Sequence, residues 1–379
     1  MKILYTICVS TYGGAPKHVL DLASSLQKKG HDCYIVCPKG EMVCEYRKVG
    51  LKVITLDLKS GIDPFYILRL RRILIREKID ILHTHLLKST VNGLLAGFLA
   101  RTRVKIAHIH GTLFDWEVSL VKRRLNIWVN SLVTNLLADK VVALTEVVKK
   151  NLINNDKIRK EKIVVIPNGI DGAALKKIGE RGFLFKKYAW DEEKIKIVGS
   201  VSRLTVERGQ KYLIEAAEII IRQFNRPEIR FVLIGDGELR EQLEDEVREK
   251  ELGQYVKFAG FLSEDDKNKA MVDFNVFVSS AIREGFGLSV LQAMFAKIPL
   301  VVSDLEVYNE LCPNGECSLQ VESGNPNDFA EKILAVLRDK ALQAKLVLLA
   351  YERASKNFSL EKFIHNYLTL YEKQLKEKQ

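Results

Sequence analysis

Residues 276–290 have the sequence VFVSSAIREGFGLSV, and this stretch decides the fold of the second half of the chain. It starts with a short apolar run, Val276–Ser279, which is typical of a buried parallel strand. Two glycines, Gly285 and Gly287, then interrupt the pattern, and the apolar segment Val290–Ala296 predicts a helix. A strand that leads through a glycine-containing loop into a helix is half of a βαβ unit, so a parallel sheet is expected here.

The same alternation extends over the rest of the second half. Short apolar runs predict further strands at Lys196–Val201, Arg230–Gly235, Val256–Ala259 and Leu300–Ser303. Segments with apolar residues at helical spacing predict helices at Gln210–Phe224, Glu238–Lys250 and Asn327–Arg338.

The first half has the same rhythm. Strands are expected at Lys2–Val9, Cys33–Cys37, Lys52–Leu56, Ile79–His83 and Lys105–His110. Helices are expected at His18–Lys29 and Pro64–Lys78. A chain of 379 residues exceeds the size of one ordinary core, which also indicates two domains.

We therefore predict an α/β protein with two doubly wound, Rossmann-like domains, residues 1–175 and 190–355, facing each other across a cleft. The linker is placed near Ile170–Tyr188, where Asn168-Gly169 and several lysines interrupt the pattern. In open α/β sheets, ligands bind beyond the carboxyl ends of the strands, so residues there are the candidates for a site.

Composition narrows the protein class. The net charge is +11, but residues 1–180 contain 30 Lys and Arg against 16 Asp and Glu, so all of the basic excess lies in the first half. Such a half either has a solvated lysine-rich surface or attracts an anionic partner. The six cysteines fit no zinc pattern and predict buried free thiols. No signal peptide and no apolar run of 18 residues is evident, so a cytoplasmic location is expected.

Three loops carry residues suited to an anionic ligand. Gly13-Gly14 lies between the first strand and the first helix, as either a tight turn or an anion-binding helix start. Arg203 and Arg208 follow the strand Lys196–Val201, and guanidinium groups bind phosphate oxygens in a bidentate fork. Glu284 precedes the Val290 helix, where its carboxylate either stabilises the helix or accepts hydrogen bonds from sugar hydroxyls.

These residues together resemble the GT-B glycosyltransferases of family 4, which are retaining enzymes. The resemblance extends from Gly13-Gly14 to about Leu337. It rests on the stretches Ile166–Asp171, Ser202–Leu204, Glu207–Gly209, Ile234–Gly237 and Glu284–Gln292. Each is weak alone, but the set in this order is specific.

The resemblance implies a function and roles. The chain would move a sugar from a UDP-, GDP- or ADP-sugar to a glycan or lipid-linked acceptor, in cell-surface polysaccharide or lipopolysaccharide assembly. Arg203, Arg208 and Glu284 would act with His110 on the reacting sugar and its diphosphate. The other donor contacts would come from Gly13, Gly14, Phe261, Leu262, Phe286, Gly287, Leu288 and Gln292. The helix near residues 358–379 would pack back on the first domain.

The chain departs from the family pattern at two positions. The family usually has glutamate where this chain has Gln292, and lysine where it has Arg208. An amide lacks the charge that strengthens a hydrogen bond to a ribose hydroxyl, at a cost of roughly 1–2 kcal/mol. Arginine keeps the charge but changes its reach. Gln292 leaves open a catalytically weak sugar-nucleotide-binding protein, and the shared architecture leaves open a sugar-nucleotide 2-epimerase.

Metal is not expected to take part in the reaction. The chain has no D-x-D sequence, so arginines would take over the charge stabilisation that a divalent ion provides elsewhere. His83-x-His85 and His108-x-His110 could each place two imidazoles on one strand face, but no third ligand is predictable. We expect His18, His31 and His365 at the surface or at helix caps.

Two basic segments suggest a membrane surface as a partner. Residues 68–78 (LRLRRILIREK) and 120–128 (LVKRRLNIW) interleave Lys and Arg with large apolar residues. Each is either a core-facing helix with a solvated basic face or a helix that lies on an anionic membrane surface. Nucleic acid is not expected, because aromatic residues are not clustered with the charge.

Overall fold

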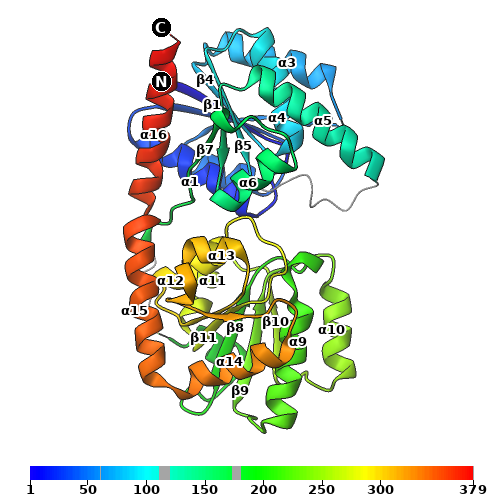
Figure 1. The fold of residues 1–379 in the computed structure, drawn as a ribbon, viewed down its shortest axis with the longest axis vertical. Coiled ribbons are helices and arrows are strands. Elements are labelled where there is room, and N and C mark those ends of the chain that lie inside the picture. The colour runs from blue at the N-terminus through cyan, green and yellow to red at the C-terminus, as the bar shows by residue number, and fades with distance from the viewer. Residues whose placement is uncertain (60, 111–119, 173–180, 379) are drawn as a thin grey trace. The chain divides into compact units, whose positions relative to one another are not determined.

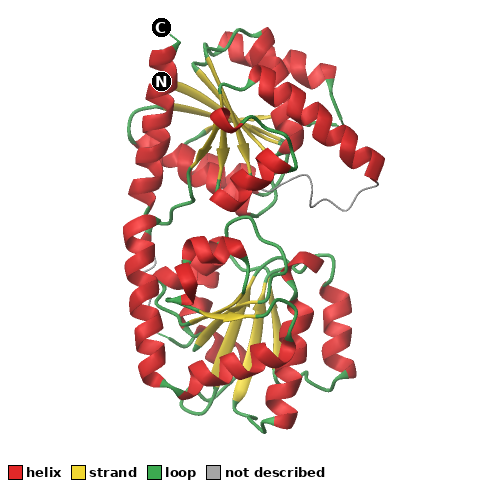
Figure 2. Cartoon of the chain, in the orientation of Figure 1, coloured by secondary structure: helices red, strands yellow, loops and turns green. Residues whose placement is uncertain are grey.

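In the computed structural model, which describes residues 1–59, 61–110, 120–172 and 181–378, the chain divides into two units. The first consists of Met1–Asn168 with Glu361–Gln379, and the second is Gly169–Leu360. Each unit is a parallel sheet with helices on both faces (Figures 1 and 2), which confirms the predicted fold class. Residues 173–180, in the predicted linker, lie outside the described residues.

The first unit contains a seven-stranded sheet in the order β3-β2-β1-β4-β5-β6-β7, and every neighbouring pair is parallel. Its strands are β1 (Lys2–Ile7), β2 (Asp32–Cys37), β3 (Lys52–Thr55), β4 (Ile81–His85), β5 (Val104–Ile109), β6 (Lys140–Ala143) and β7 (Ile163–Val165). The order reverses between β1 and β4, and at such a point the loops that follow the strands diverge and leave room for a ligand.

Helices cover both faces of this sheet. They are α1 (Gly14–Lys28), α2 (Met42–Lys48), α3 (Pro64–Arg76), α4 (Leu87–Leu99), α5 (Leu120–Leu137), α6 (Glu146–Asn154) and α16 (Leu360–Glu377). Helices α3, α4 and α5 pack side by side in sequence order (Figure 1). Helix α16 packs against the sheet through Tyr367 and Tyr371, whose hydroxyls contact His108 and His83.

The period of two along each strand separates an apolar face from a polar one. Leu4 and Leu82 belong to a core with Leu70 of α3. Tyr5 and His83 alternate with them along the strands and lie on the face that α16 covers. One face of this sheet therefore contains a hydrophobic core, whereas the other buries aromatic and imidazole side chains.

The second unit contains a six-stranded parallel sheet in the order β10-β9-β8-β11-β12-β13. Its strands are β8 (Lys196–Val201), β9 (Ile229–Ile234), β10 (Val256–Gly260), β11 (Val276–Ser279), β12 (Leu300–Ser303) and β13 (Leu319–Val321). Its helices are α8 (Phe183–Tyr188), α9 (Gln210–Glu218), α10 (Arg240–Glu249), α11 (Glu264–Val272), α12 (Leu288–Phe295), α13 (Glu306–Leu311), α14 (Pro326–Arg338) and α15 (Lys340–Asn357). Here the order reverses between β8 and β11.

The structure corrects several predicted boundaries. The strand predicted at Ile79–His83 is β4, Ile81–His85, so both histidines of its H-T-H sequence lie in the strand. The helix predicted at Gln210–Phe224 changes to a π-helical turn at Ile219–Gln223. The short strands β6, β7 and β13 were not predicted.

The prediction that all six cysteines are buried free thiols is wrong. Cys312 and Cys317 form a disulfide, because the turn Pro313–Gly315 brings their Cα atoms to 5.5 Å, within the range that a disulfide spans. Cys33 and Cys37 are buried free thiols, whereas Cys44 is exposed. None of the described helices is long and apolar enough to cross a bilayer.

Candidate functional site

In the second unit, four loops at the carboxyl ends of the strands are joined by backbone hydrogen bonds. Glu207, after β8, accepts hydrogen bonds through its carbonyl from the N–H groups of Ile282 and Arg283, after β11. The Gly235 N–H, after β9, donates to the Gly260 carbonyl at the end of β10. The loops therefore form one network at the point where the strand order reverses.

Glycine is required where these loops cross. Gly235 has φ +134°, and a Cβ there would lie 1.9 Å from the Ser202 carbonyl oxygen. Gly209 has φ +62°, and a Cβ there would lie 2.1 Å from the Ser280 carbonyl oxygen. Any side chain at either position would separate the loops.

Arg208 and Glu284, which the sequence places 76 residues apart, form an ion pair in this network. Their side chains are only 24% and 16% exposed. Burial by itself lowers the pKa of the Arg208 guanidinium, but the Glu284 carboxylate raises it, and the net shift is upward. A permanent positive charge and a carboxylate thus lie together at the carboxyl edge of the sheet.

Arg203 lies on the same β8 loop but is far more exposed, at 66%, and its guanidinium is 3.6 Å from the Glu207 carboxylate. The loop is held by Gln210, a buried residue whose side-chain amide donates to the Ser202 hydroxyl and to the Arg203 carbonyl. Sequence reasoning missed Gln210, because a glutamine at a helix start has no distinguishing pattern. Arg203 is therefore on a fixed backbone with its charged end in solvent.

Helix α12 starts directly after Glu284-Gly285-Phe286-Gly287. Gly287, at φ +92°, precedes the first turn, and no side chain caps the helix. The N–H groups at Leu288 and the next residues are therefore available to an anion. Phe286 is buried against Phe358, and Gln292 lies one turn into α12, half-buried.

Two other predicted donor contacts follow β10. Phe261 is 53% exposed and Leu262 is half-buried. An exposed aromatic ring next to this loop network could cover a base. The structure thus brings Arg203, Arg208, Glu284 and the α12 start into one network, with Phe261 and Leu262 on the loop that follows Gly260.

The remaining predicted residues belong to the first unit. Gly13 and Gly14 are exposed at the start of α1, where the Gly13 carbonyl accepts from the Lys17 N–H. His110 follows β5, half-buried, and its Nε2 atom lies 3.1 Å from Nδ1 of His85. Gly13, Gly14 and His110 therefore follow β1 and β5 at the carboxyl edge of the first sheet.

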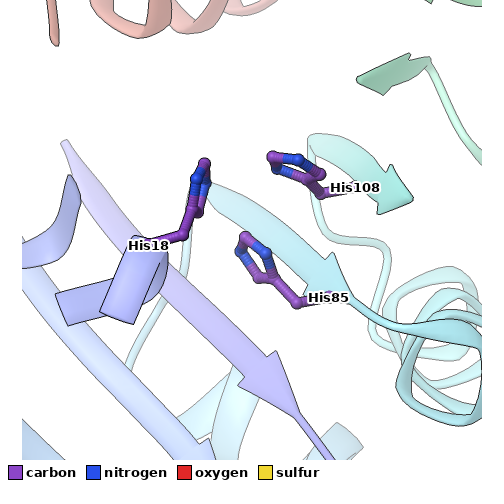
Figure 3. Close-up of side chains that lie close together, drawn as sticks. All are labelled: His18, His85 and His108. Atoms are coloured by element: carbon purple, nitrogen blue, oxygen red, sulfur yellow. The ribbon is translucent and has the colours of Figure 1, made fainter. Parts of the chain in front are cut away.

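His110 is part of a histidine cluster, which we define as His18, His83, His85, His108 and His110. His85 and His108 are direct neighbours in the β4–β5 register, and the period of two puts His83 and His110 on the same face. His18 comes from α1, and its ring centroid is 4.4 Å from that of His108 (Figure 3).

The prediction that His18 lies at the surface or at a cap is wrong. His18 is 3% exposed, because α1 covers the sheet face onto which the other histidines point. Burial lowers its pKa to about 4, against an opposing hydrogen bond to Asn168. Burial, together with the neighbouring histidines, also lowers the pKa of the other four well below 6.5. The cluster is therefore uncharged near neutral pH.

Comparisons with known proteins agree over most of the chain. A family model described as Glycosyltransferase Family 4 matches residues 12–173, and one described as Glycosyl transferases group 1 matches residues 180–353. An Escherichia coli UDP-Gal:alpha-D-GlcNAc-diphosphoundecaprenol alpha-1,3-galactosyltransferase is 25% identical over 356 residues, which cover 90% of this chain and 89% of that protein. A Staphylococcus aureus capsular polysaccharide biosynthesis glycosyltransferase, CapM, is 23% identical over 366 residues, which cover 93% of this chain and 92% of that protein.

The fold has close counterparts among solved structures. Anabaena HepE in complex with UDP and glucose superposes with a TM-score of 0.86 at 22% identity, over 98% of this chain and 100% of that one. A glycosyltransferase from Rickettsia africae superposes with a TM-score of 0.84 at 21% identity, over 99% and 98%. The chain therefore belongs to the family 4 glycosyltransferases with the GT-B fold, and it is a glycosyltransferase.

Proposed function

We propose that this glycosyltransferase takes its sugar from a nucleotide diphosphate and transfers it, with retention of anomeric configuration, to a glycan or lipid-linked acceptor in polysaccharide assembly. The observation that carries the proposal is the Arg208–Glu284 pair, held in a loop network where the second sheet reverses its strand order. The E. coli and S. aureus relatives, named for a lipid-linked acceptor and for capsular polysaccharide, support the acceptor class.

In this proposal Arg208 and Glu284 bind different parts of the donor, the diphosphate and the sugar. Arg208 and Arg203 bind the diphosphate, and the N–H groups at the start of α12 contribute further donors. Glu284, as an acceptor-only carboxylate, binds hydroxyls of the transferred sugar. Gln292 faces the ribose, and Phe261 with Leu262 lies beside the base. Gly13, Gly14 and His110 are assigned to the same reaction from the family resemblance.

The transfer breaks the bond between the anomeric carbon and the diphosphate oxygen and forms a bond from that carbon to the acceptor oxygen. The acceptor attacks from the face that the phosphate leaves, so the configuration is retained, and the acceptor proton passes to the leaving phosphate oxygen. The arginines stabilise the negative charge on the leaving group. His110 orients or polarises the sugar through a ring nitrogen.

We propose that transfer needs no Mg²⁺ or Mn²⁺, because two guanidinium groups and an uncapped helix start supply positive potential at the diphosphate. Transfer by protein freed of Mg²⁺ and Mn²⁺ should therefore proceed at the rate found with either ion present. A loss of activity that Mg²⁺ or Mn²⁺ restores would contradict this part of the proposal.

We also propose that the first unit binds anionic membrane surfaces through α3 and α5. Large apolar side chains on these helices are exposed, including Phe65 (77%) and Trp128 (62%), and Arg and Lys lie between them. Anionic headgroups attract the basic residues while exposed apolar side chains enter the interface. Substituting serine for Phe65 and Trp128 together should reduce flotation with anionic vesicles, whereas Leu348→Ser, an exposed leucine on α15, should not.

The function is tested by product analysis with panels of UDP-, GDP- and ADP-sugars. Release of the nucleoside diphosphate with formation of a glycoside supports transfer. An epimerised sugar nucleotide would identify a 2-epimerase instead, and donor binding without turnover would identify a binding protein.

A further inference from the structure

Four buried imidazole nitrogens in the histidine cluster have no hydrogen-bond partner among the described residues. They are the Nε2 atoms of His18, His83, His85 and His108. A buried polar atom without a partner costs about 1–3 kcal/mol, so a ligand shared by several of these nitrogens would be stabilising. A single metal ion can accept lone pairs from several imidazole nitrogens at once, whereas hydrogen bonds would need a separate donor for each nitrogen.

Three of these histidines converge. Ligand nitrogens of His18, His85 and His108 all lie within 4.8 Å of one another. Their ring centroids are 4.4, 5.1 and 5.4 Å apart, close to the spacing of about 5 Å expected for imidazoles that share a tetrahedral metal ion. We propose that His18, His85 and His108 form a binding site for a divalent transition-metal ion (Figure 3).

The other ring nitrogens are already engaged, as metal-binding histidines require. Nδ1 of His18 lies 2.6 Å from Oδ1 of Asn168, which only accepts, so the His18 proton is on Nδ1 and its Nε2 has a free lone pair. Nδ1 of His108 contacts the Tyr367 hydroxyl at 3.0 Å, and Nδ1 of His85 contacts His110 at 3.1 Å. Each ring is thus oriented by a second contact while its Nε2 stays available.

The chemistry of the site selects the ion. Neutral imidazoles suit Zn²⁺, Co²⁺ and Ni²⁺, whereas Mg²⁺ and Ca²⁺ prefer oxygen ligands. Three protein ligands leave a fourth position for water. The site belongs to the first unit, so it is distinct from the arginines proposed to stabilise the diphosphate. Metal-free chemistry at the diphosphate and an occupied histidine site are therefore compatible.

An occupied site would also position His110. When Nε2 of His85 binds the metal, Nδ1 of His85 must carry its proton and donate it to Nε2 of His110. The proton of neutral His110 then resides on its own Nδ1. The metal would thus fix the tautomer of the histidine that the resemblance places near the reacting sugar.

The test is metal binding by full-length protein without a polyhistidine tag. Protein stripped with a chelator and titrated with Co²⁺ should bind one equivalent and develop the visible bands of four-coordinate cobalt. X-ray absorption of the zinc-loaded protein should show imidazole nitrogens at about 2.0–2.1 Å. His18→Gln and His108→Gln should each weaken cobalt binding at least about 100-fold.

Two control variants separate this site from surface chelation. His365→Gln changes an exposed histidine and Cys44→Ser an exposed thiol, and both should bind cobalt as the wild type does. Failure of the wild type to bind one equivalent would overturn the proposal. So would a sulfur or all-oxygen shell, or unchanged binding in folded His18→Gln and His108→Gln. If those variants do not fold, the X-ray absorption spectrum of the zinc-loaded wild type decides whether imidazole nitrogens bind the ion.

Discussion

Replacing Arg208 by glutamine should weaken both the second unit and its affinity for donor. The substitution leaves the Glu284 carboxylate, which is 16% exposed, without its cationic partner, while it still accepts a hydrogen bond from the Gly285 N–H. Breaking a fully buried pair costs about 3–5 kcal/mol, and an exposed pair is worth about 0–1 kcal/mol. At these exposures we expect a loss of about 1–3 kcal/mol, which lowers Tm by roughly 3–10 °C in a unit of this size.

The effect on the donor is expected from the lost guanidinium–phosphate bond. A hydrogen bond to a charged group contributes about 1.5–3 kcal/mol, so the Kd for a UDP-sugar should rise about 10- to 150-fold in titration calorimetry. Arg208→Lys, which restores the usual family residue, should lie between wild type and Arg208→Gln. The matched control is Arg222→Gln, which removes an exposed pair with Glu218 and should leave donor affinity unchanged.

A double-mutant cycle separates the two effects. Adding Glu284→Gln to Arg208→Gln removes the stranded carboxylate, so the double variant should recover about 1–3 kcal/mol of stability relative to the sum of the single losses. Donor affinity should not recover. Folded Arg208→Gln protein that binds UDP-sugar within twofold of wild type would refute the assignment of Arg208 to the diphosphate.

Three further outcomes are expected. Gly235→Ala forces a side chain onto the Ser202 carbonyl at φ +134° and should lower the free energy of urea unfolding by more than about 2 kcal/mol. Gly253→Ala is the control, because a Cβ there has no described neighbour within 4 Å, and it should lower that free energy by under about 1 kcal/mol. Equal losses in the two variants would contradict the loop crossing. Burial raises the pKa of the Cys33 thiol to about 12 and that of the Cys37 thiol to about 11. At pH 8 iodoacetamide should therefore label the exposed Cys44 first, and it should label Cys33 and Cys37 only as the pH rises towards 11. Labelling of Cys33 at pH 8 to the same extent as Cys44, measured by peptide mass, would be inconsistent with this burial. Gln292→Glu should tighten donor binding about 5- to 30-fold if this side chain meets the ribose, and an unchanged Kd would place it elsewhere.

The sequence predicts the sheet architecture well, because buried parallel strands are continuous apolar runs. Lys196–Val201, Val276–Ser279 and Leu300–Ser303 were each predicted with the bounds of β8, β11 and β12. The positions of the loop residues at the strand ends can then be predicted as well, because the carboxyl ends of parallel strands lie at one edge of the sheet. Arg208 and Glu284 could therefore be assigned to one edge from the sequence.

Contacts that depend on packing between distant segments could not be predicted. The sequence shows His83-x-His85 and His108-x-His110, but the third imidazole comes from His18, whose burial depends on how α1 packs on the sheet. The role of Gln210 could not be predicted either, because its hydrogen bonds to the β8 loop depend on where α9 begins. Helical periodicity identifies which face is apolar but not which polar residue on that face will be enclosed.

The most direct test of the donor assignment is the anomeric configuration of the sugar after turnover. The protein is incubated, without added Mg²⁺ or Mn²⁺, with each α-linked UDP-, GDP- or ADP-sugar in turn. The anomeric proton of the newly formed product is followed by NMR before free sugar can mutarotate. We expect release of the nucleoside diphosphate with an α-configured product, and no comparable turnover by Arg208→Gln. A β-configured product, or no consumption of any UDP-, GDP- or ADP-sugar by folded protein, would contradict it.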